Sequence, residues 1–402
     1  MERFRRFVLA SALAAGTIMA AVVPSSAHKP ITSPYTYNED VFPVLRDRCG
    51  RCHVTGGVAP MSLMTHEDTV PWGESIRVEL LARHMPPWTV DAAPGRFQNV
   101  QPMTAREMNV LLTWATGGTP LGDPDKSPTP RTHDQSWPIG PPDLSLPFPA
   151  EFTLPASAQE DTVEIVIPTG TTERRFVRAV DLRPGTPSIV RAATVRVRSA
   201  PPAPAVGAGT EAVLALWLPG DEPVPLAENT AFELPAGAEL LVRVHYKKTW
   251  QYERKEMTDR STIGMYFAPE PSSVVRAVTL SPNATTPGAA GVGPLSFGHT
   301  LAESVRVLAI YPAETIANAG VVITATGPDG EKQELIAFHP RAGWPRRFWL
   351  RQPIALDRGT RLDARVTFDD EAALLPMSAA PTRAVGPDPS ALRLTLNVAP
   401  AQ

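Results

Sequence analysis

The sequence predicts a multidomain chain in which a small all-α domain is followed by an all-β region of antiparallel sandwiches. Three observations lead to this fold class. Helical periodicity of apolar residues is confined to residues 28–124, alternation of polar and apolar residues fills the chain beyond residue 155, and 45 of the 402 residues are proline. Proline normally makes up about 5% of a protein, and it breaks hydrogen bonds inside helices. Long helical bundles are therefore excluded.

The first 27 residues are typical of a cleaved export signal. A basic start over Met1–Arg6 precedes an apolar stretch over Phe7–Val23, and Ser25-Ser26-Ala27 supplies small residues before a cleavage site. We expect a signal peptide over 1–27, a mature chain that begins at His28, and a periplasmic or secreted location. The alternative is a retained membrane anchor, although the apolar stretch is short for a bilayer span and consists mostly of small residues.

Residues 28–124 contain both cysteines and the helical patterns. The clearest helix begins with the capping box Thr104-Ala105-Arg106-Glu107 and ends before Gly117-Gly118. Weaker patterns predict helices from about Thr65 to Arg83 and from Glu39 to Arg48. The last of these leads directly into the cysteines.

The rest of the chain reads as a linker and strands. Residues 125–155 are dense in Pro, Gly and polar residues and predict a Pro-rich linker. Beyond them the apolar period is two, most clearly over 162–167, 191–197, 239–246 and 361–368. Gly and Pro clusters between these runs are typical of antiparallel sandwiches. A Gly/Pro/Ala-rich break at 281–294 divides the region into a first sandwich over 156–280 and a second over 281–402.

Charge and missing motifs exclude several function classes. The chain has 38 Lys+Arg against 41 Asp+Glu, a formal charge of −3, and the pairs Lys247-Lys248 and Arg346-Arg347 are too short for a nucleic-acid patch. We therefore expect no nucleic-acid partner. The sequence also lacks a phosphate-binding glycine loop, a serine nucleophile elbow and a zinc-protease helix. With two cysteines there is no disulfide framework.

Cys49-Gly50-Arg51-Cys52-His53 is the motif with the most specific chemistry. Two thiols at this spacing can each form a thioether to one porphyrin, and the histidine that follows can ligate the iron. A thioredoxin-like pair would need a βαβ context, and a zinc half-site would need a second cysteine pair. The motif therefore predicts one covalent haem c attached through Cys49 and Cys52, with His53 as an axial iron ligand. Export agrees with haem attachment outside the cytoplasm.

Met85 is the predicted sixth ligand of the iron. Met85-Pro86-Pro87-Trp88 follows a predicted helix, and its two prolines stiffen the loop that would hold the sulfur. A His and Met pair raises the reduction potential and suits electron transfer. His84 or an open site are alternatives. The remaining candidates are Met61, Met64, His66, Met103 and Met108, of which the last two are explained by packing around the terminal helix.

Several motifs occur together as they do in a known family. They are Cys49-x-x-Cys52-His53, Ala59-Pro60-Met61-Ser62-Leu63, Met85-Pro86-Pro87-Trp88, Leu182-Arg183-Pro184-Gly185, Trp217-Leu218-Pro219-Gly220, Leu234-Pro235-Ala236-Gly237, Val244-His245-Tyr246, Gly359-Thr360-Arg361 and the helix through Trp114. Residues 38–124 resemble the cytochrome c module of a group of exported bacterial proteins. In that group the module is fused to a copper type II, ascorbate-dependent monooxygenase-like region, similar to peptidylglycine hydroxylating monooxygenase. The resemblance implies a class I cytochrome c domain followed by two tandem jelly-roll-like sandwiches.

The copper ligands that this resemblance implies are mostly replaced. Arg191-Ala192 stands where the family has a His-His pair, and Ala313-Glu314-Thr315 stands where it has His-x-His. His245, matching the third histidine of the electron-transfer copper, is the relic that remains. One imidazole cannot hold copper against exchange, so we do not expect bound copper.

The other candidate ligands lack partners in the sequence. His299 and His339 lie on strand-like stretches and are interpreted as surface or packing residues, and Asp369-Asp370-Glu371 as a solvated loop. A free amine at His28 could chelate copper, but no second histidine is identifiable as its partner.

Three functions are compatible with these features. The first is a periplasmic monohaem electron-transfer protein, not an enzyme, whose monooxygenase-like β region serves docking or assembly. The second is a copper- and haem-dependent monooxygenase, and the third is a structural subunit of an envelope redox complex. The intact haem motif beside a replaced copper set favours the first. It implies redox protein partners in the periplasm, soluble or in a membrane complex, which the sequence does not name.

Overall fold

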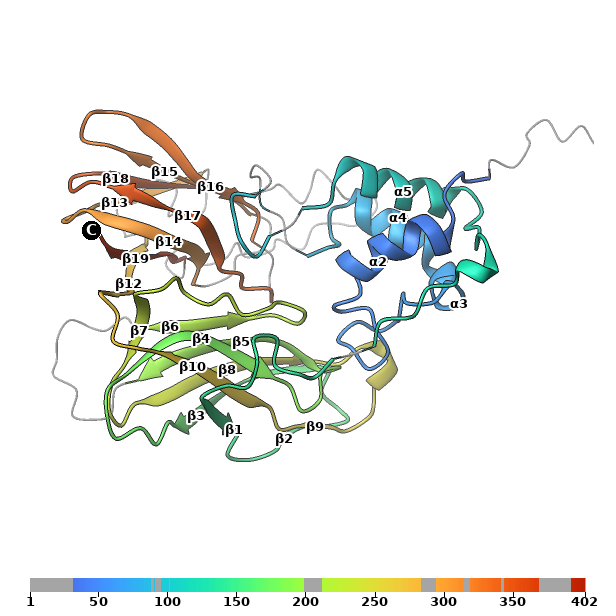
Figure 1. Cartoon of the computed structure of the whole chain (residues 1–402), viewed down its shortest axis with the longest axis horizontal. Coiled ribbons are helices and arrows are strands. Elements are labelled where there is room, and N and C mark those ends of the chain that lie inside the picture. Colours follow the sequence, from blue (N-terminus) through green and yellow to red (C-terminus); the bar gives the residue numbers. More distant parts are fainter. Residues whose placement is uncertain are drawn as a thin grey trace, which may run out of the picture.

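The computed structural model describes residues 32–87, 90, 95–100, 102–132, 134–198, 212–282, 294–313, 319–340, 343–368 and 392–401. Figure 1 shows helices gathered at one end of the molecule and strands in two groups at the other. The predicted signal peptide, including its cleavage site, lies outside the described residues. Among the helices that are described, none is long and apolar enough to cross a bilayer.

The helical part consists of short elements around one core. They are η1 (Tyr37–Val41), α2 (Phe42–Arg48), α3 (His66–Thr69), η2 (Val70–Trp72), α4 (Gly73–Leu81), α5 (Ala105–Thr116) and η3 (Pro124–Lys126). The capping box of α5 is confirmed, since Thr104 and Glu107 bond each other's backbone N–H. The predicted helix over 65–83 is broken into three pieces, with Pro71 in the 3-10 turn between α3 and α4. Leu111 and Trp114 of α5 are fully buried with Tyr37 and Leu45.

The first group of strands encloses one hydrophobic core. One sheet has the order β1 (Leu144–Pro147), β10 (Thr262–Ala268), β4 (Arg175–Arg183), β7 (Thr230–Leu234) and β11 (Ser273–Val274). The second has the order β3 (Glu160–Pro168), β8 (Glu239–Lys247), β5 (Val190–Arg198) and β6 (Val213–Trp217), and β2 (Phe152–Leu154) pairs with β9 (Met257–Asp259). Side chains from both sheets, such as Val180 and Val242, meet in the same core. The strands predicted over 162–167, 191–197 and 239–246 are confirmed as β3, β5 and β8.

The second group has two four-stranded sheets around its own core. One has the order β12 (Arg276–Leu280), β19 (Leu394–Pro400), β14 (Val305–Pro312) and β17 (Phe348–Leu356). The other has the order β13 (Leu295–Thr300), β18 (Arg361–Phe368), β15 (Ala319–Thr326) and β16 (Lys332–Phe338). Ile310 and Ile323 are among the side chains from the two sheets that share the core. The strand predicted over 361–368 is confirmed as β18.

The predicted fold class, a small all-α class I cytochrome c domain followed by two tandem jelly-roll-like antiparallel sandwiches, is wrong. The chain is mostly β, with 41% of it in strands of several small sheets and 15% in helices, so no all-α domain stands on its own. Between α4 and α5 the chain leaves the helices: Val90 forms an antiparallel bridge with Phe338, and Phe97 forms one with Leu350. Phe97 is 2% exposed and belongs to the core of the second strand group.

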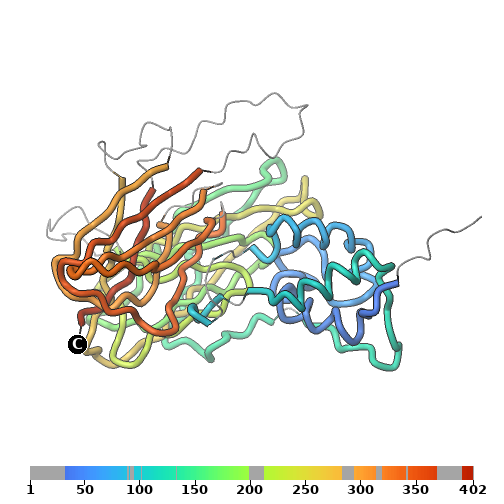
Figure 2. Tube along the Cα trace, turned by 90° about the horizontal axis from the view of Figure 1, so that it is seen from above, coloured from blue at the N-terminus to red at the C-terminus, as the bar shows by residue number. Residues whose placement is uncertain are grey.

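The bridging segment over 95–100 is fixed along its length. Gln98 N–H donates to the Trp349 carbonyl at 2.8 Å, and Arg351 N–H donates to the Arg96 carbonyl at 2.9 Å. Figure 2 shows this part of the chain, in cyan, running from the helices to the orange strands. A few extended residues have no helical period, which is why the sequence pattern did not separate them from their helical surroundings.

We predict that Phe97→Ala destabilises the second strand group. Removing a buried Phe side chain costs about 3–5 kcal/mol, because transfer energy is lost and a cavity remains. Urea unfolding should show the loss, and amide exchange at Arg351 should speed up while exchange at Trp114 in α5 changes little. Phe368→Ala, at a side chain 37% exposed on β18, is the matched control. An unchanged Arg351 exchange rate would contradict the bridging role of this segment.

Candidate functional site

The cysteine motif sits on a tight turn at the end of α2. Cys49 N–H donates to the Leu45 carbonyl at 2.8 Å, and the N–H groups of Cys52 and His53 both donate to the Cys49 carbonyl. A Cβ at residue 50 would lie 2.6 Å from the Arg46 carbonyl oxygen, so this position requires glycine. The turn thus places Cys49, Cys52 and His53 within one short hydrogen-bonded stretch of backbone.

His53 is held as a neutral ring. Its Nδ1 lies 3.2 Å from the Met61 carbonyl oxygen. A carbonyl can only accept, so Nδ1 carries the proton and Nε2 keeps its lone pair. Burial lowers the pKa of His53 and further favours the neutral form. A metal-ligating histidine needs this tautomer, fixed by a second partner at its other nitrogen.

Cys49 and Cys52 are free thiols rather than a disulfide. Burial raises the pKa of each to about 12, so both are protonated at neutral pH. The Cys52 Sγ lies 3.5 Å from the Pro219 carbonyl oxygen, in the loop that follows β6. The turn is therefore in contact with the first strand group.

The candidates for a sixth ligand lie in different surroundings. Met85 follows α4 and is 36% exposed, whereas Met64 is 2% exposed and packs against Gly50 of the turn. The ring of His66 bonds the Thr119 carbonyl at 2.8 Å, and His84 lies 3.2 Å from Glu79. Met61, Met103 and Met108 pack against the helical core. The contact of Met64 with Gly50 was not foreseen, because the sequence offers no signal for a contact across a loop.

Arg51 and Arg191 connect the turn to the first strand group. The Arg51 guanidinium donates to the Gly220 carbonyl at 3.0 Å and pairs with Glu222 at 3.1 Å. Arg191 lies at a bulge in β5. Its guanidinium donates to the carbonyl of Val58, five residues after the motif, and to the Lys247 carbonyl at 3.1 Å. Burial lowers the pKa of Arg191 to about 10, which leaves it charged at neutral pH.

A buried ion pair lies behind this junction. Arg346 and Asp221 are 2.6 Å apart, and Arg346 also donates to the Asn99 carbonyl at 2.9 Å. The pair links the loop after β6, the start of β17 and the bridging segment. Burial raises the pKa of Asp221, although the Arg346 charge opposes this.

The positions of the implied copper ligands do not form a cluster of imidazoles. Ala192 pairs with His245 across β5 and β8, and the His245 Nδ1 lies 3.1 Å from the Thr162 hydroxyl. Burial lowers the pKa of His245. Ala313 N–H donates to the Arg393 carbonyl, while Glu314 and Thr315 lie outside the described residues. Within the described ranges, no three His, Cys, Asp or Glu side chains group as metal ligands.

The remaining sequence candidates lie apart from the turn. His299 is exposed on β13, and His339 follows β16 next to Gly320. Asp369-Asp370-Glu371 and His28 fall outside the described residues.

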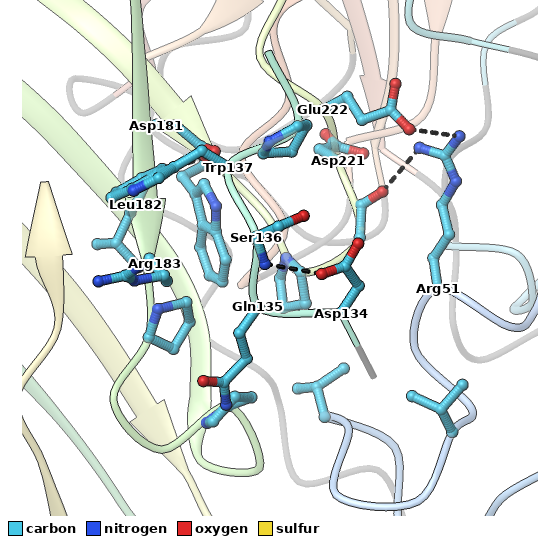
Figure 3. Close-up of a pocket in the computed structure, with 18 of the residues that line it drawn as sticks. Arg51, Asp134, Gln135, Ser136, Trp137, Asp181, Leu182, Arg183, Asp221 and Glu222 are labelled. Atoms are coloured by element: carbon cyan, nitrogen blue, oxygen red, sulfur yellow. Dashed lines mark hydrogen bonds and ion pairs between the residues drawn. The ribbon is translucent and has the colours of Figure 1, made fainter. Parts of the chain in front are cut away.

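A cavity of about 370 Å³ lies between the turn and β4. Its lining includes Gly50, Arg51, Asp181, Trp137 and Trp217. Figure 3 shows Arg51 on one side of it and Asp181 and Trp137 on the other. Asp181 is 5% exposed, and burial raises the pKa of its carboxyl to about 7. Sequence reasoning missed this acid, because its burial depends on residues far apart in the chain.

We predict that Asp181 makes stability fall as pH rises from about 4 to about 7. In this range the unfolded carboxyl has lost its proton and the folded one retains it, so the unfolded state binds fewer protons and folding is penalised. Three pKa units correspond to roughly 4 kcal/mol as an upper bound. Asp181→Asn should flatten this slope in urea unfolding measured at several pH values. An unchanged slope would show that the carboxyl is ionised in the folded chain.

No family model matches the chain, and no match was found among curated proteins. A xanthan lyase from Paenibacillus is 10% identical over 69% of this chain and 28% of the lyase, with a TM-score of 0.17. A223, a turret protein of the Sulfolobus turreted icosahedral virus, is 11% identical over 64% of this chain and 97% of its own, with a TM-score of 0.15. Bacillus subtilis oxalate decarboxylase is 8% identical, covering 58% and 82%, with a TM-score of 0.11. Likenesses this weak support no conclusion about fold or function.

Proposed function

We propose that the chain is an exported, periplasmic c-type electron-transfer protein with one covalent haem. The observation that supports this most is the set of groups on one turn: two free thiols and an imidazole whose Nδ1 is held by the Met61 carbonyl. These groups fit the donors that haem c requires, two thioether sulfurs and one neutral ring nitrogen. When bound, haem supplies a one-electron couple.

The protein residues around the turn would position the haem and adjust its environment. Cys49 and Cys52 would hold it covalently, and His53 would present Nε2 to the iron. Arg51 and Arg191 place two positive charges beside the turn, and a positive charge favours the more reduced state of a nearby redox centre. Arg191 therefore acts here as a cation that ties the turn to β5, in the place where the resembled family has copper ligands. Copper is not part of the proposal.

The first strand group would then serve as a built-in docking partner of the haem turn. Its loop over 219–222 contacts Arg51 and Cys52, so this side of the motif is covered by the chain itself. An external redox partner in the periplasm would have to approach over a different surface.

We predict that the chain exported by a host with a haem c assembly system retains haem after acid denaturation, seen by peroxidase staining of a denaturing gel. Thioethers survive denaturation, whereas a ligand bond to iron does not. Cys52→Ala should leave at most one thioether and shift the haem absorption band to longer wavelength. Arg48→Ala, one residue before the motif, should leave attachment intact. Haem that is fully extracted by acidified acetone would refute the proposal.

We predict that Met85→Ala removes the weak sulfur-to-iron absorption band at the red end of the oxidised spectrum and lowers the reduction potential. A thioether ligand favours ferrous iron, so its loss favours the ferric state. His84→Ala is the neighbouring control and should change neither. If Met64→Ala removes the band and Met85→Ala does not, the sixth ligand is the buried methionine beside Gly50.

A further inference from the structure

The cavity between the haem turn and β4 is formed by the outer face of a sheet. A bulge in the pairing of β4 with β10 sets which side chains of β4 face the core beyond it. Leu182 faces the core, and Asp181 lies on the opposite face of the sheet. Gly264 pairs with Asp181 across the two strands. A Cβ on Gly264 would lie 2.8 Å from the Trp137 ring, so glycine makes room for the indole beside the acid. Both faces of β4 are therefore covered.

Asp181 is well ordered but has no cation partner among the described residues. Its Oδ1 accepts from the Leu182 N–H at 2.8 Å, and its carboxyl accepts from the Trp217 indole. The surrounding titratable and charged groups are Arg178 and Arg183 on β4, Tyr266 and Asp143 across the sheet, Asp221 and Glu222 after β6, Arg347 before β17, and Arg51, Arg131 and Asp134 along the cavity. None of these groups changes the pKa of Asp181 appreciably. Burial is the main cause of its raised pKa.

Three arginines line the cavity, and two of them are engaged. Arg51 pairs with Glu222, and Arg183 lies over the Trp137 ring with its guanidinium carbon 4.9 Å from the ring centre, whereas Arg131 is exposed at the cavity wall. Figure 3 shows Arg51 on the side of the cavity opposite Arg183. A carboxylate buried without a countercharge is costly, and a bound cation removes that cost. An anionic ligand would instead be repelled by this carboxylate.

The rest of the lining suits an apolar group. Trp137 and Trp217 supply two indoles, and the prolines at 138, 184, 187 and 219 supply apolar walls without a backbone N–H. Indole rings also attract cations at their faces. A volume of about 370 Å³ is at the small end of ligand sites, enough for a molecule with one ring and a short chain.

We propose that this cavity binds a primary alkylammonium with an aromatic or similar apolar tail, with the ammonium at Asp181 and the tail between Trp137, Trp217 and the prolines. Binding keeps the Asp181 carboxylate ionised, so affinity should increase as pH rises through about 7, where alkylammonium groups are still protonated.

The test is calorimetric titration of the full chain, as isolated, with phenethylammonium, and with 2-phenylethanol and phenylacetate as neutral and anionic probes of similar shape. We expect only phenethylammonium to bind. Its affinity should increase between pH 6 and 8 in proportion to the fraction of Asp181 that is ionised in the free protein. Asp181→Asn should weaken binding by about tenfold or more. Glu331→Gln, which changes an exposed acid in the turn between β15 and β16, outside the cavity, should leave the affinity unchanged.

Three outcomes would overturn the inference. They are equal binding of all three probes, undiminished binding by Asp181→Asn, and no heat from phenethylammonium at millimolar concentration. If Asp181→Asn does not fold, two other measurements still test the inference. One is the pH dependence of phenethylammonium binding to the unmodified chain. The other is its affinity for Trp217→Phe, which should be lower because the indole donor to Asp181 is lost. Haem staining of the same sample separates failure of this site from failure of the electron-transfer proposal.

Discussion

The buried ion pair of Asp221 and Arg346 joins all three parts of the molecule. Asp221 belongs to the loop that also contacts Arg51 and Cys52, and Arg346 precedes β17 and bonds the Asn99 carbonyl. Taking two charges out of water is costly, and the cost is recovered only when geometry and further hydrogen bonds are good. Loss of one partner would leave a buried charge without its countercharge. That charge would lie where the turn over Cys49–His53, the first strand group and the bridging segment meet. The relative placement of these parts therefore depends on this pair.

The sequence predicts local structure well where a residue pattern is compatible with only one kind of secondary structure. The capping box at Thr104 and the alternation over 239–246 each identified a real element, because period and cap chemistry are local. The fold class failed because residues 95–100 carry no such pattern and take their structure from β17. The turn at Cys49 is encoded in five consecutive residues, while Asp181 becomes special only through Gly264 and Trp137. Sites assembled from distant strands leave no local signal, so sequence reasoning could not find them.

The two candidate sites share a wall but use different physics. At the cysteine turn, burial favours the neutral form of His53, and the Met61 carbonyl fixes its proton on Nδ1. At the cavity, burial itself favours the protonated Asp181, and a ligand charge would reverse that preference. Arg51 lies in both surroundings, within the cysteine motif and along the cavity. An ammonium bound at Asp181 would ionise that acid as it binds, so below about pH 7 the two charges cancel and the net charge beside the turn changes little.

The bridging segment has a consequence for the order of folding. During synthesis the helices emerge long before β17, yet residues 95–100 can complete their backbone hydrogen bonds only when that strand is present. Contacts between such distant residues are slow to form, and unpaired strand edges are prone to aggregate in the meantime. If the chain carries the proposed haem, attachment at Cys49 and Cys52 would take place before the first strand group covers the turn through its loop over 219–222. Assembly of this protein would then be a sequence of steps rather than a single event.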